Sequence, residues 1–406
     1  MRQWPAMLAL GAVALASLWL LALVRHAGPD GSAGDFVPLW TGAAMAVRGF
    51  GTAIWDTGTF QAFQVEELGT AYRDLPWLYP PTALMLFWPV GLLPLAAGWL
   101  VWSMAGITAW CVACRVALGR CGLGHLWWVG LTAPAVMLNL GLGQNGLFFG
   151  AALVAGLALA PSRPVLAGCL LALLAAKPQM GLMVPLALAL GGHWRAFGAA
   201  TGATLAFAGA ATLVFGAGAW VAFIDGLAQS NLRVVGKALY ILMQPTWRGS
   251  ASLISAPDAV RMIATLLPPA GAAALLIWAG RGVLRTPAGL LALTPLATVC
   301  GGIYLLVYDM TAWACALIVL LPAMRGIAGR MAWWIAWALP GGVLMINLLT
   351  PGLVPMLVWL VGVLAVLCLR RTEGAQGHVT ALDSGPDRTQ FGAASGPDGP
   401  TGKAGP

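Results

Sequence analysis

Long apolar runs separated by short polar breaks dominate this sequence. A helix needs about 20 apolar residues to cross the ~30 Å hydrocarbon core of a bilayer, and several runs reach that length. Backbone groups in lipid must bond within their own segment, so the runs are predicted to be helices. The pattern predicts an all-α, polytopic transmembrane protein of about 11–13 helical pieces. The runs are Trp4 to Val24, 82–118, 125–141, 144–160, 164–192, 195–216, 260–280, 286–307, 310–323, 331–349 and 353–369.

Two of these runs are interrupted by proline. Prolines divide 82–118 into a short helix followed by a longer one, and Lys177-Pro178 divides 164–192 into two pieces too short to cross alone. With both chain termini predicted on the cytosolic side, the number of full crossings must be even, so at least one piece is predicted to be re-entrant or partial. The side on which Arg115 and Arg120 lie depends on which piece that is.

Composition agrees with a membrane protein, because 60% of the 406 residues are hydrophobic and only 8% are charged. The net charge of +8 comes from Lys and Arg scattered singly or in pairs between apolar runs. The positive-inside rule produces this scatter, so membrane lipid is the expected partner and nucleic acid is not. The seven Cys lie in apolar segments and the four His are isolated from one another, so we predict no metal site and no cofactor.

Six of the thirteen acidic residues fall within residues 25–81, together with three Arg and many aromatic residues. This outer loop is predicted to lie on the non-cytosolic side and to fold onto the membrane surface, with 37–47 as an amphipathic interfacial helix. Residues 371–406 are rich in Gly, Pro and Ser and are predicted to be a disordered cytosolic tail. Residues 1–370 would then form one transmembrane domain.

Carboxylates are scarce behind the outer loop, with no Asp or Glu between Thr82 and Phe223. Asp35, in Gly34-Asp35-Phe36, precedes the predicted interfacial helix at the mouth of a membrane cavity. A carboxylate there can take the proton from an attacking hydroxyl, which makes Asp35 the candidate general base. The alternative is that Asp35 is an N-cap, because Asp is favoured at that position.

Lys177 is the one lysine in the apolar body, and it stands at a helix break. A cation at membrane depth normally faces a cavity or a partner, although snorkelling to the interface is the alternative. No acid lies within forty residues on either side, so a lipid phosphate is the predicted counter-charge.

Three further motifs could line a polar cavity. Tyr79 belongs to an aromatic, proline-rich helix start, which could equally be only a rigid anchor. Gln144 and Asn145 occupy a glycine-rich break, and their amides could bind a sugar or merely form a turn. Asp309 could orient an acceptor or mark a tight turn between spans.

Together these motifs resemble glycosyltransferase family 87, the polytopic transferases of the C-type fold that include polyprenol-phosphate-mannose-dependent mannosyltransferases. The resemblance covers about residues 5–370. It rests on Gly34-Asp35-Phe36, Tyr79-Pro80-Pro81 with Leu93-Pro94, Gly143-Gln144-Asn145, Lys177-Pro178 with His193-Trp194-Arg195, and Tyr308-Asp309.

The resemblance implies an inverting transfer of a hexose or pentose, with mannose-like sugars favoured, from a polyprenyl-phosphate donor. The acceptor would be a lipid-linked or envelope glycan at the outer face of the cytoplasmic (inner) membrane. Asp35 would be the general base, and Lys177 would hold the donor phosphate, alone or with Arg residues near the outer surface. Tyr79, Gln144, Asn145 and Asp309 would line the sugar and acceptor cavity. The chain has no Asp-x-Asp motif, so no metal is implied.

A transporter or flippase of lipid-linked sugars is the alternative from another class, because it would also need a buried cation and a polar cavity. The acidic, aromatic outer loop favours the transferase. A membrane acyltransferase is less compatible, because no intramembrane His lies in a polar motif.

Overall fold

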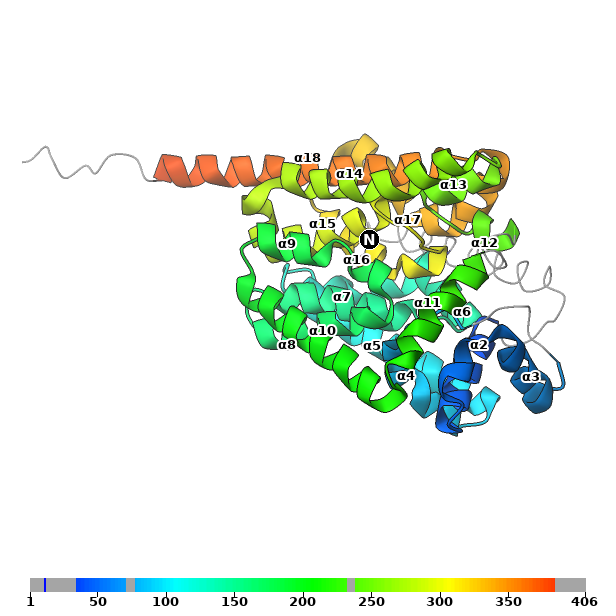
Figure 1. The fold of residues 1–406 in the computed structure, drawn as a ribbon. Helices are drawn as coiled ribbons and strands as arrows, with labels where there is room; N and C mark the ends of the chain where they lie inside the picture. The colour runs from blue at the N-terminus through cyan, green and yellow to red at the C-terminus, as the bar shows by residue number, and fades with distance from the viewer. Residues whose placement is uncertain (1–10, 12–33, 71–76, 232–237, 384–406) are drawn as a thin grey trace, which may run out of the picture.

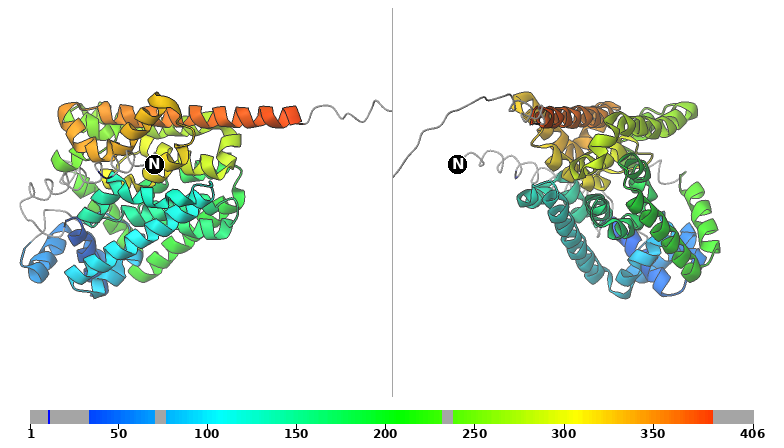
Figure 2. Two further views of the ribbon diagram at one scale, coloured as in Figure 1. Left: turned by 180° about the vertical axis from the view of Figure 1, so that it is seen from behind. Right: turned by 90° about the vertical axis from the view of Figure 1, so that its left-hand side faces the viewer.

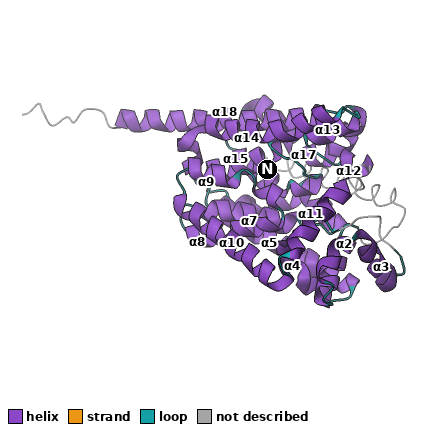
Figure 3. Cartoon of the chain, in the orientation of Figure 1, coloured by secondary structure: helices purple, strands orange, loops and turns teal. Residues whose placement is uncertain are grey.

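The computed structural model describes residue 11 and residues 34–70, 77–231 and 238–383. This described part contains α-helices and short 3-10 segments and no strand (Figures 1 and 3). Five of its helices are long and apolar enough to cross a membrane, which confirms the prediction of an all-α polytopic membrane protein. They are α5 (Leu95–Gly119), α10 (Trp194–Phe215), α14 (Asp258–Arg285), α17 (Gly326–Leu349) and the Leu353–Thr372 part of α18. The predicted first span, apart from Gly11, lies outside the described residues.

The molecule has two distinct ends. Figure 1 shows α2 (Phe36–Val47), α3 (Thr57–Leu68), α12 (Ala238–Leu242) and α13 (Trp247–Leu253) at one end, called here the α2 end. The C-terminal part of α18 extends from the opposite end, the tail end, and the left view of Figure 2 shows the same arrangement from behind.

Basic residues mark the tail end. The Arg370 side chain donates a hydrogen bond from Nη1 to the carbonyl oxygen of Trp278 (3.1 Å), so the C-terminal part of α14 reaches this end too. Arg281 and Arg285 follow Trp278 in α14. Arg281, Arg285 and Arg370 thus lie at the tail end.

The 82–118 run forms α4 (Pro81–Phe87), the 3-10 segment η2 (Trp88–Leu92) and then α5, as its prolines predict. The chain stays at the α2 end before α5 begins, because η2 packs against α2 and Trp40 Nε1 donates to the carbonyl oxygen of Leu93 at 2.8 Å. The first half of the run therefore does not cross. The 25 residues of α5 span roughly 37 Å, which carries Arg120 to the tail end.

The 164–192 run is re-entrant. It forms α8 (Pro164–Ala172), η4 (Leu173–Ala176), η5 (Pro178–Gly181) and α9 (Val184–Leu190), with the predicted break at Lys177. The His193 ring, just after α9, lies 3.2 Å from the carbonyl oxygen of Leu284 near the end of α14, at the tail end. The chain thus enters from the tail end, turns at Lys177 in the interior and returns.

Several helices differ from the sequence prediction. The 125–141 run is a 3-10 segment, η3 (Gly124–Thr132), followed by α6 (Pro134–Leu142), because a proline disfavours helical geometry in the residue before it. The segment between α10 and α14 contains short helices that the hydrophobic pattern did not predict, namely α11 (Gly218–Asn231), α12 and α13. The central helices are α7 (Gly146–Leu159), α15 (Pro287–Cys300) and α16 (Thr311–Leu320).

The 37–47 segment is helical as predicted, but it is not an interfacial helix with a polar face. Most residues of α2 are buried, because the helix is apolar nearly all round and packs against η2, α4 and α5. Its one polar side chain within 37–47, Thr41, donates to the carbonyl oxygen of Val37 and accepts a hydrogen bond from Gln64 of α3.

The outer loop is closed by polar contacts between α2 and α3. Arg48 forms a bidentate pair with Glu67 at 2.5 and 2.7 Å, and this hydrogen bonding holds the pKa of the Glu67 carboxyl below its ordinary value. Asp56 caps α3 by accepting hydrogen bonds from the hydroxyl and backbone N–H of Thr59, which lower the pKa of Asp56. The loop is thus folded in residues 34–70.

Part of the predicted disordered tail is helical. α18 runs from Leu353 to Asp383, so residues 371–383 continue the helix rather than leaving it. No proline interrupts this stretch, and the pair Gly385-Pro386 comes only after it. Residues 384–406 lie outside the described residues.

Candidate functional site

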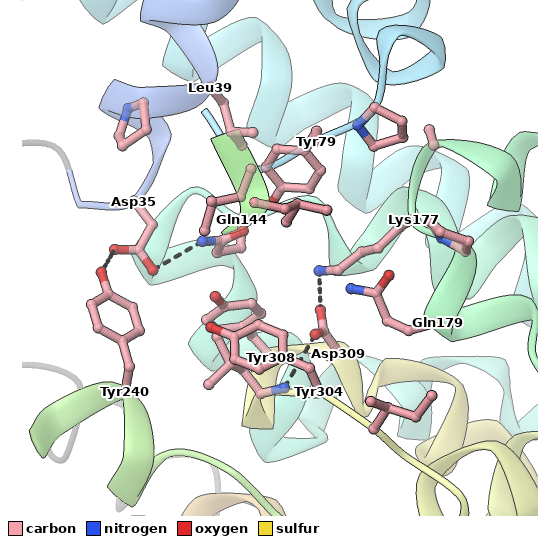
Figure 4. Close-up of a pocket in the computed structure, with 18 of the residues that line it drawn as sticks. Asp35, Leu39, Tyr79, Gln144, Lys177, Gln179, Tyr240, Tyr304, Tyr308 and Asp309 are labelled. Carbon is pink, nitrogen blue, oxygen red and sulfur yellow. Dashed lines mark hydrogen bonds and ion pairs between the residues drawn. The ribbon is translucent and has the colours of Figure 1, made fainter. Parts of the chain in front are cut away.

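A cavity of about 510 Å³ lies among helices of the α2 end (Figure 4). Its walls come from segments that are far apart in the sequence, and most of its lining is apolar. The lining residues are Asp35, Pro38, Leu39, Leu78, Tyr79, Pro80, Gln144, Ala176, Lys177, Pro178, Gln179, Leu182, Phe223, Leu227, Tyr240, Arg248, Ile303, Tyr304, Leu306, Tyr308 and Asp309.

Asp35 occupies one side of the cavity and is only 6% exposed. Gln144 Nε2 donates to Asp35 Oδ2 at 2.9 Å, and the Tyr240 hydroxyl donates to Asp35 Oδ1 at 3.3 Å (Figure 4). Although Asp35 stands at the N-cap position of α2, its side chain makes no capping hydrogen bond. The carboxylate is therefore turned into the cavity instead of serving the helix end.

Two glycines allow the segment carrying Gln144 to approach Asp35. Gly34 has φ +67° and Gly143 has φ +68°, a region that other residues rarely adopt. A Cβ on Gly34 would lie 2.8 Å from the carbonyl oxygen of Leu142, and one on Gly143 would lie 2.6 Å from Phe36 Cβ. The start of α2 and the break between α6 and α7 are thus in direct backbone contact.

Lys177 occupies the other side of the cavity, facing Asp309 (Figure 4). The two residues form a buried ion pair, and Lys177 Nζ also donates to Asn145 Oδ1 at 3.0 Å. Asn145 Nδ2 in turn donates to the Tyr79 hydroxyl at 2.7 Å. The break at Lys177 therefore places the ammonium in a network that joins four separate segments.

The segment carrying Asp309 is fixed from both sides. The N–H of Leu306, the residue before η6 (Val307–Asp309), donates to Asp309 Oδ2 at 3.2 Å. Asn139 Nδ2 donates to the carbonyl oxygen of Tyr308 at 3.2 Å, and the Thr311 hydroxyl donates to the carbonyl oxygen of Gly146 at 2.8 Å. The Asp309 carboxylate is thereby held at a set position.

Substitution of Gly146 tests the close packing between the start of α7 and the segment that carries Asp309. A Cβ at this position would lie 2.2 Å from the carbonyl oxygen of Tyr308, so Gly146→Ala must push the Asp309 segment away. We expect a loss of about 1–3 kcal/mol in the free energy of unfolding, together with lower activity. Gly202→Ala on α10 is the matched control, because a Cβ there meets nothing within 4 Å. Thermal unfolding of both variants in detergent measures the difference, and equal stability would show that the contact at Gly146 does not matter.

The structure brings together five of the six predicted site residues as cavity lining: Asp35, Tyr79, Gln144, Lys177 and Asp309. Asn145 is not among the lining residues. It is fully buried and lies behind the wall, where it connects Tyr79 with Lys177. Lys177 also has a protein counter-charge that its sequence neighbours did not indicate, because Asp309 is 132 residues away.

Sequence reasoning missed several lining residues, among them Gln179, Tyr240, Arg248, Tyr304 and Tyr308. One signal was available, because four of the five tyrosines of the chain line this cavity. Nothing in the sequence distinguished Arg248 from the other basic residues that lie between apolar runs. Tyr240 and Arg248 lie on α12 and α13, two of the short helices that the hydrophobic pattern did not predict.

The fold and this cavity define a helical membrane protein with carboxylates and cations gathered in one mostly apolar chamber. Within the described residues, no group of three or more His, Cys, Asp or Glu side chains could hold a metal ion. The family model of glycosyltransferase family 87 matches residues 77–308, which is more than half of the chain, so the chain belongs to glycosyltransferase family 87 and is a membrane glycosyltransferase.

The matched region includes Tyr79, Gln144, Asn145 and Lys177, whereas Asp35 precedes it and Asp309 follows it directly. No curated protein matches the chain, and no solved structure matches it.

Proposed function

We propose that the protein transfers a sugar from a polyprenyl-phosphate donor to a glycan or glycolipid acceptor, with Asp35 as the general base. One observation carries this proposal: a buried carboxylate and two cations, Lys177 and Arg248, line the same cavity. A carboxylate can accept the proton of a hydroxyl nucleophile, and a cation can stabilise a phosphate leaving group.

In the proposed reaction an acceptor hydroxyl oxygen attacks the anomeric carbon from the face opposite the phosphate. The bond between the anomeric carbon and the phosphate oxygen breaks, the phosphate keeps the bonding electrons, and the configuration is inverted. The hydroxyl proton passes to Asp35. Gln144 and Tyr240 support this step, because their hydrogen bonds hold the carboxylate in one orientation.

Lys177 is proposed to contact the donor phosphate. Its ammonium has three donors, of which Asp309 and Asn145 each use one. Asp309 and Gln144 would bind sugar or acceptor hydroxyls, with Tyr79 beside them and Asn145 supporting from behind the wall. The apolar walls formed by Leu182, Phe223 and Leu227 suit an isoprenoid chain.

A mannose-like sugar, or another hexose or pentose, is the proposed cargo, and a lipid-linked or envelope glycan is the proposed acceptor. The basic tail end supports a location in the cytoplasmic membrane with the cavity on the outer side, because Lys and Arg gather on the cytosolic face.

The direct test is turnover by the purified protein with a defined donor. We expect protein reconstituted in liposomes to consume a synthetic polyprenyl-phospho-mannose and to release polyprenyl phosphate, detected by mass spectrometry with an added glycolipid acceptor mixture. A panel of polyprenyl-phosphate hexoses and pentoses identifies the sugar, and a nucleotide sugar serves as the control donor. Movement of the intact lipid-linked sugar between leaflets without bond cleavage would instead establish the flippase alternative.

A further inference from the structure

The charges around the cavity do not fall into two equivalent pairs. Among the described residues, its lining contains two carboxylates, Asp35 and Asp309, and two cations, Lys177 and Arg248. Lys177 and Asp309 are in direct contact, with side chains only 5% and 2% exposed, so their charges largely compensate each other. Lys177 therefore has little unbalanced charge to offer a second anion.

Arg248 has no such partner in the described part of the chain. Among the described residues, no carboxylate lies within ion-pair distance of its guanidinium group, and its side chain is not fully buried. It stands on α13, in a segment that is otherwise apolar or neutral. A cation in a mostly apolar cavity, without a carboxylate to balance its charge, favours the binding of an anionic ligand.

The backbone that carries Arg248 is anchored by neutral hydrogen bonds. The Thr246 hydroxyl accepts a hydrogen bond from the Gly249 N–H at 3.2 Å and so caps α13. Asn347 Nδ2 of α17 donates to the carbonyl oxygen of Gln244 at 2.9 Å, and the Val307 N–H donates to the carbonyl oxygen of Met243 at 3.1 Å. The helix that presents Arg248 is thereby tied to the segment that carries Asp309.

We infer that Arg248 supplies the unbalanced positive charge that binds the donor phosphate, while Lys177, whose charge is paired with Asp309, contributes only its third N–H donor. This inference rests on the proposed function and assigns its phosphate contact. Without Arg248 the described lining residues would carry one net negative charge and would repel a phosphate. A guanidinium group can bind two phosphate oxygens at once, as an ammonium cannot.

The charge on the phosphate also grows during the reaction. The donor is a phosphodiester with one negative charge, whereas the released polyprenyl phosphate is a monoester with a charge of about −1.5 to −2 at neutral pH. Arg248 thus stabilises the leaving group more strongly than the bound donor, and its effect should be largest for ligands that carry a terminal phosphate.

Binding of farnesyl phosphate and of farnesol by the detergent-solubilised protein tests the inference without turnover. We expect the unaltered protein to prefer the phosphate. Arg248→Gln should weaken farnesyl phosphate binding by about tenfold or more and leave farnesol binding unchanged. Arg248→Lys, which keeps the charge, should retain most of the affinity. Arg261→Gln is the matched control, because Arg261 is a half-exposed arginine of the adjoining α14 that pairs with Asp258.

The outcomes separate this inference from the proposed function. Phosphate affinity that survives in Arg248→Gln, while the unaltered protein prefers the phosphate, overturns the role of Arg248 alone. A loss as large in Arg248→Lys as in Arg248→Gln shows that charge is not what Arg248 contributes, and also overturns it. Equal binding of farnesyl phosphate and farnesol by the unaltered protein overturns the phosphate-donor proposal itself. Thermal unfolding of each ligand-free variant identifies those that do not fold, and Arg248→Lys then decides the matter if Arg248→Gln is among them.

Discussion

Asp35→Asn is expected to abolish sugar transfer while donor binding stays intact. The substitution keeps the size of the side chain but removes its ability to accept a proton, and general base catalysis contributes about 10²–10⁴-fold to a rate. Turnover of a polyprenyl-phospho-sugar by the reconstituted variant should therefore fall by at least about 100-fold. Because both cations of the cavity lining, Lys177 and Arg248, remain in place, farnesyl phosphate should still bind at least as well as it does to the unaltered protein.

The control for this variant is Asp56→Asn. Asp56 belongs to the same outer loop, but it is exposed and caps α3, and Asn caps a helix about as well as Asp. Asp56→Asn should thus keep full activity and stability. Retained turnover in Asp35→Asn would remove Asp35 as the base, whereas lost donor binding in that variant would point to a structural role.

Lys177→Met is expected to destabilise the protein and to weaken donor binding more than acceptor binding. The variant leaves the Asp309 carboxylate buried without its ion pair, and breaking a buried pair from one side costs about 3–5 kcal/mol. Thermal unfolding measures the first effect, and titration with donor and acceptor in turnover assays measures the second. The double variant with Asp309→Asn should regain part of the stability, because no buried charge is then left alone.

The matched comparison is Arg48→Met, which breaks the solvent-accessible pair with Glu67 in the outer loop. Exposed pairs contribute about 0–1 kcal/mol, so this variant should unfold close to the unaltered protein. A Lys177→Met variant as stable as Arg48→Met would contradict the importance of the buried pair. An unchanged response to donor concentration would exclude Lys177 from the phosphate site.

The sequence by itself determined the class of the protein and much of its chain path. Apolar run lengths determine which segments can lie in lipid. Those segments must be helical, because backbone groups cannot be hydrated there and have to bond within their own segment. Proline positions determined the breaks at 88–94 and at Lys177, because proline removes a helical hydrogen bond. The distribution of acidic residues made Asp35 the candidate general base, since so few carboxylates occur in the apolar body. These are local properties, and they can be read from neighbouring residues.

Only the tertiary structure decided which polar residues meet. Asp35 contacts Gln144 and Tyr240, which are 109 and 205 residues away, and Lys177 contacts Asp309 across 132 residues. Apolar helices offer no local signal of which faces pack together. In the interior of a membrane protein that choice depends on close contact between small residues, as at Gly34, Gly143 and Gly146. The burial of α2, and the position of Arg248 away from every described carboxylate, likewise follow from packing, which no single segment specifies.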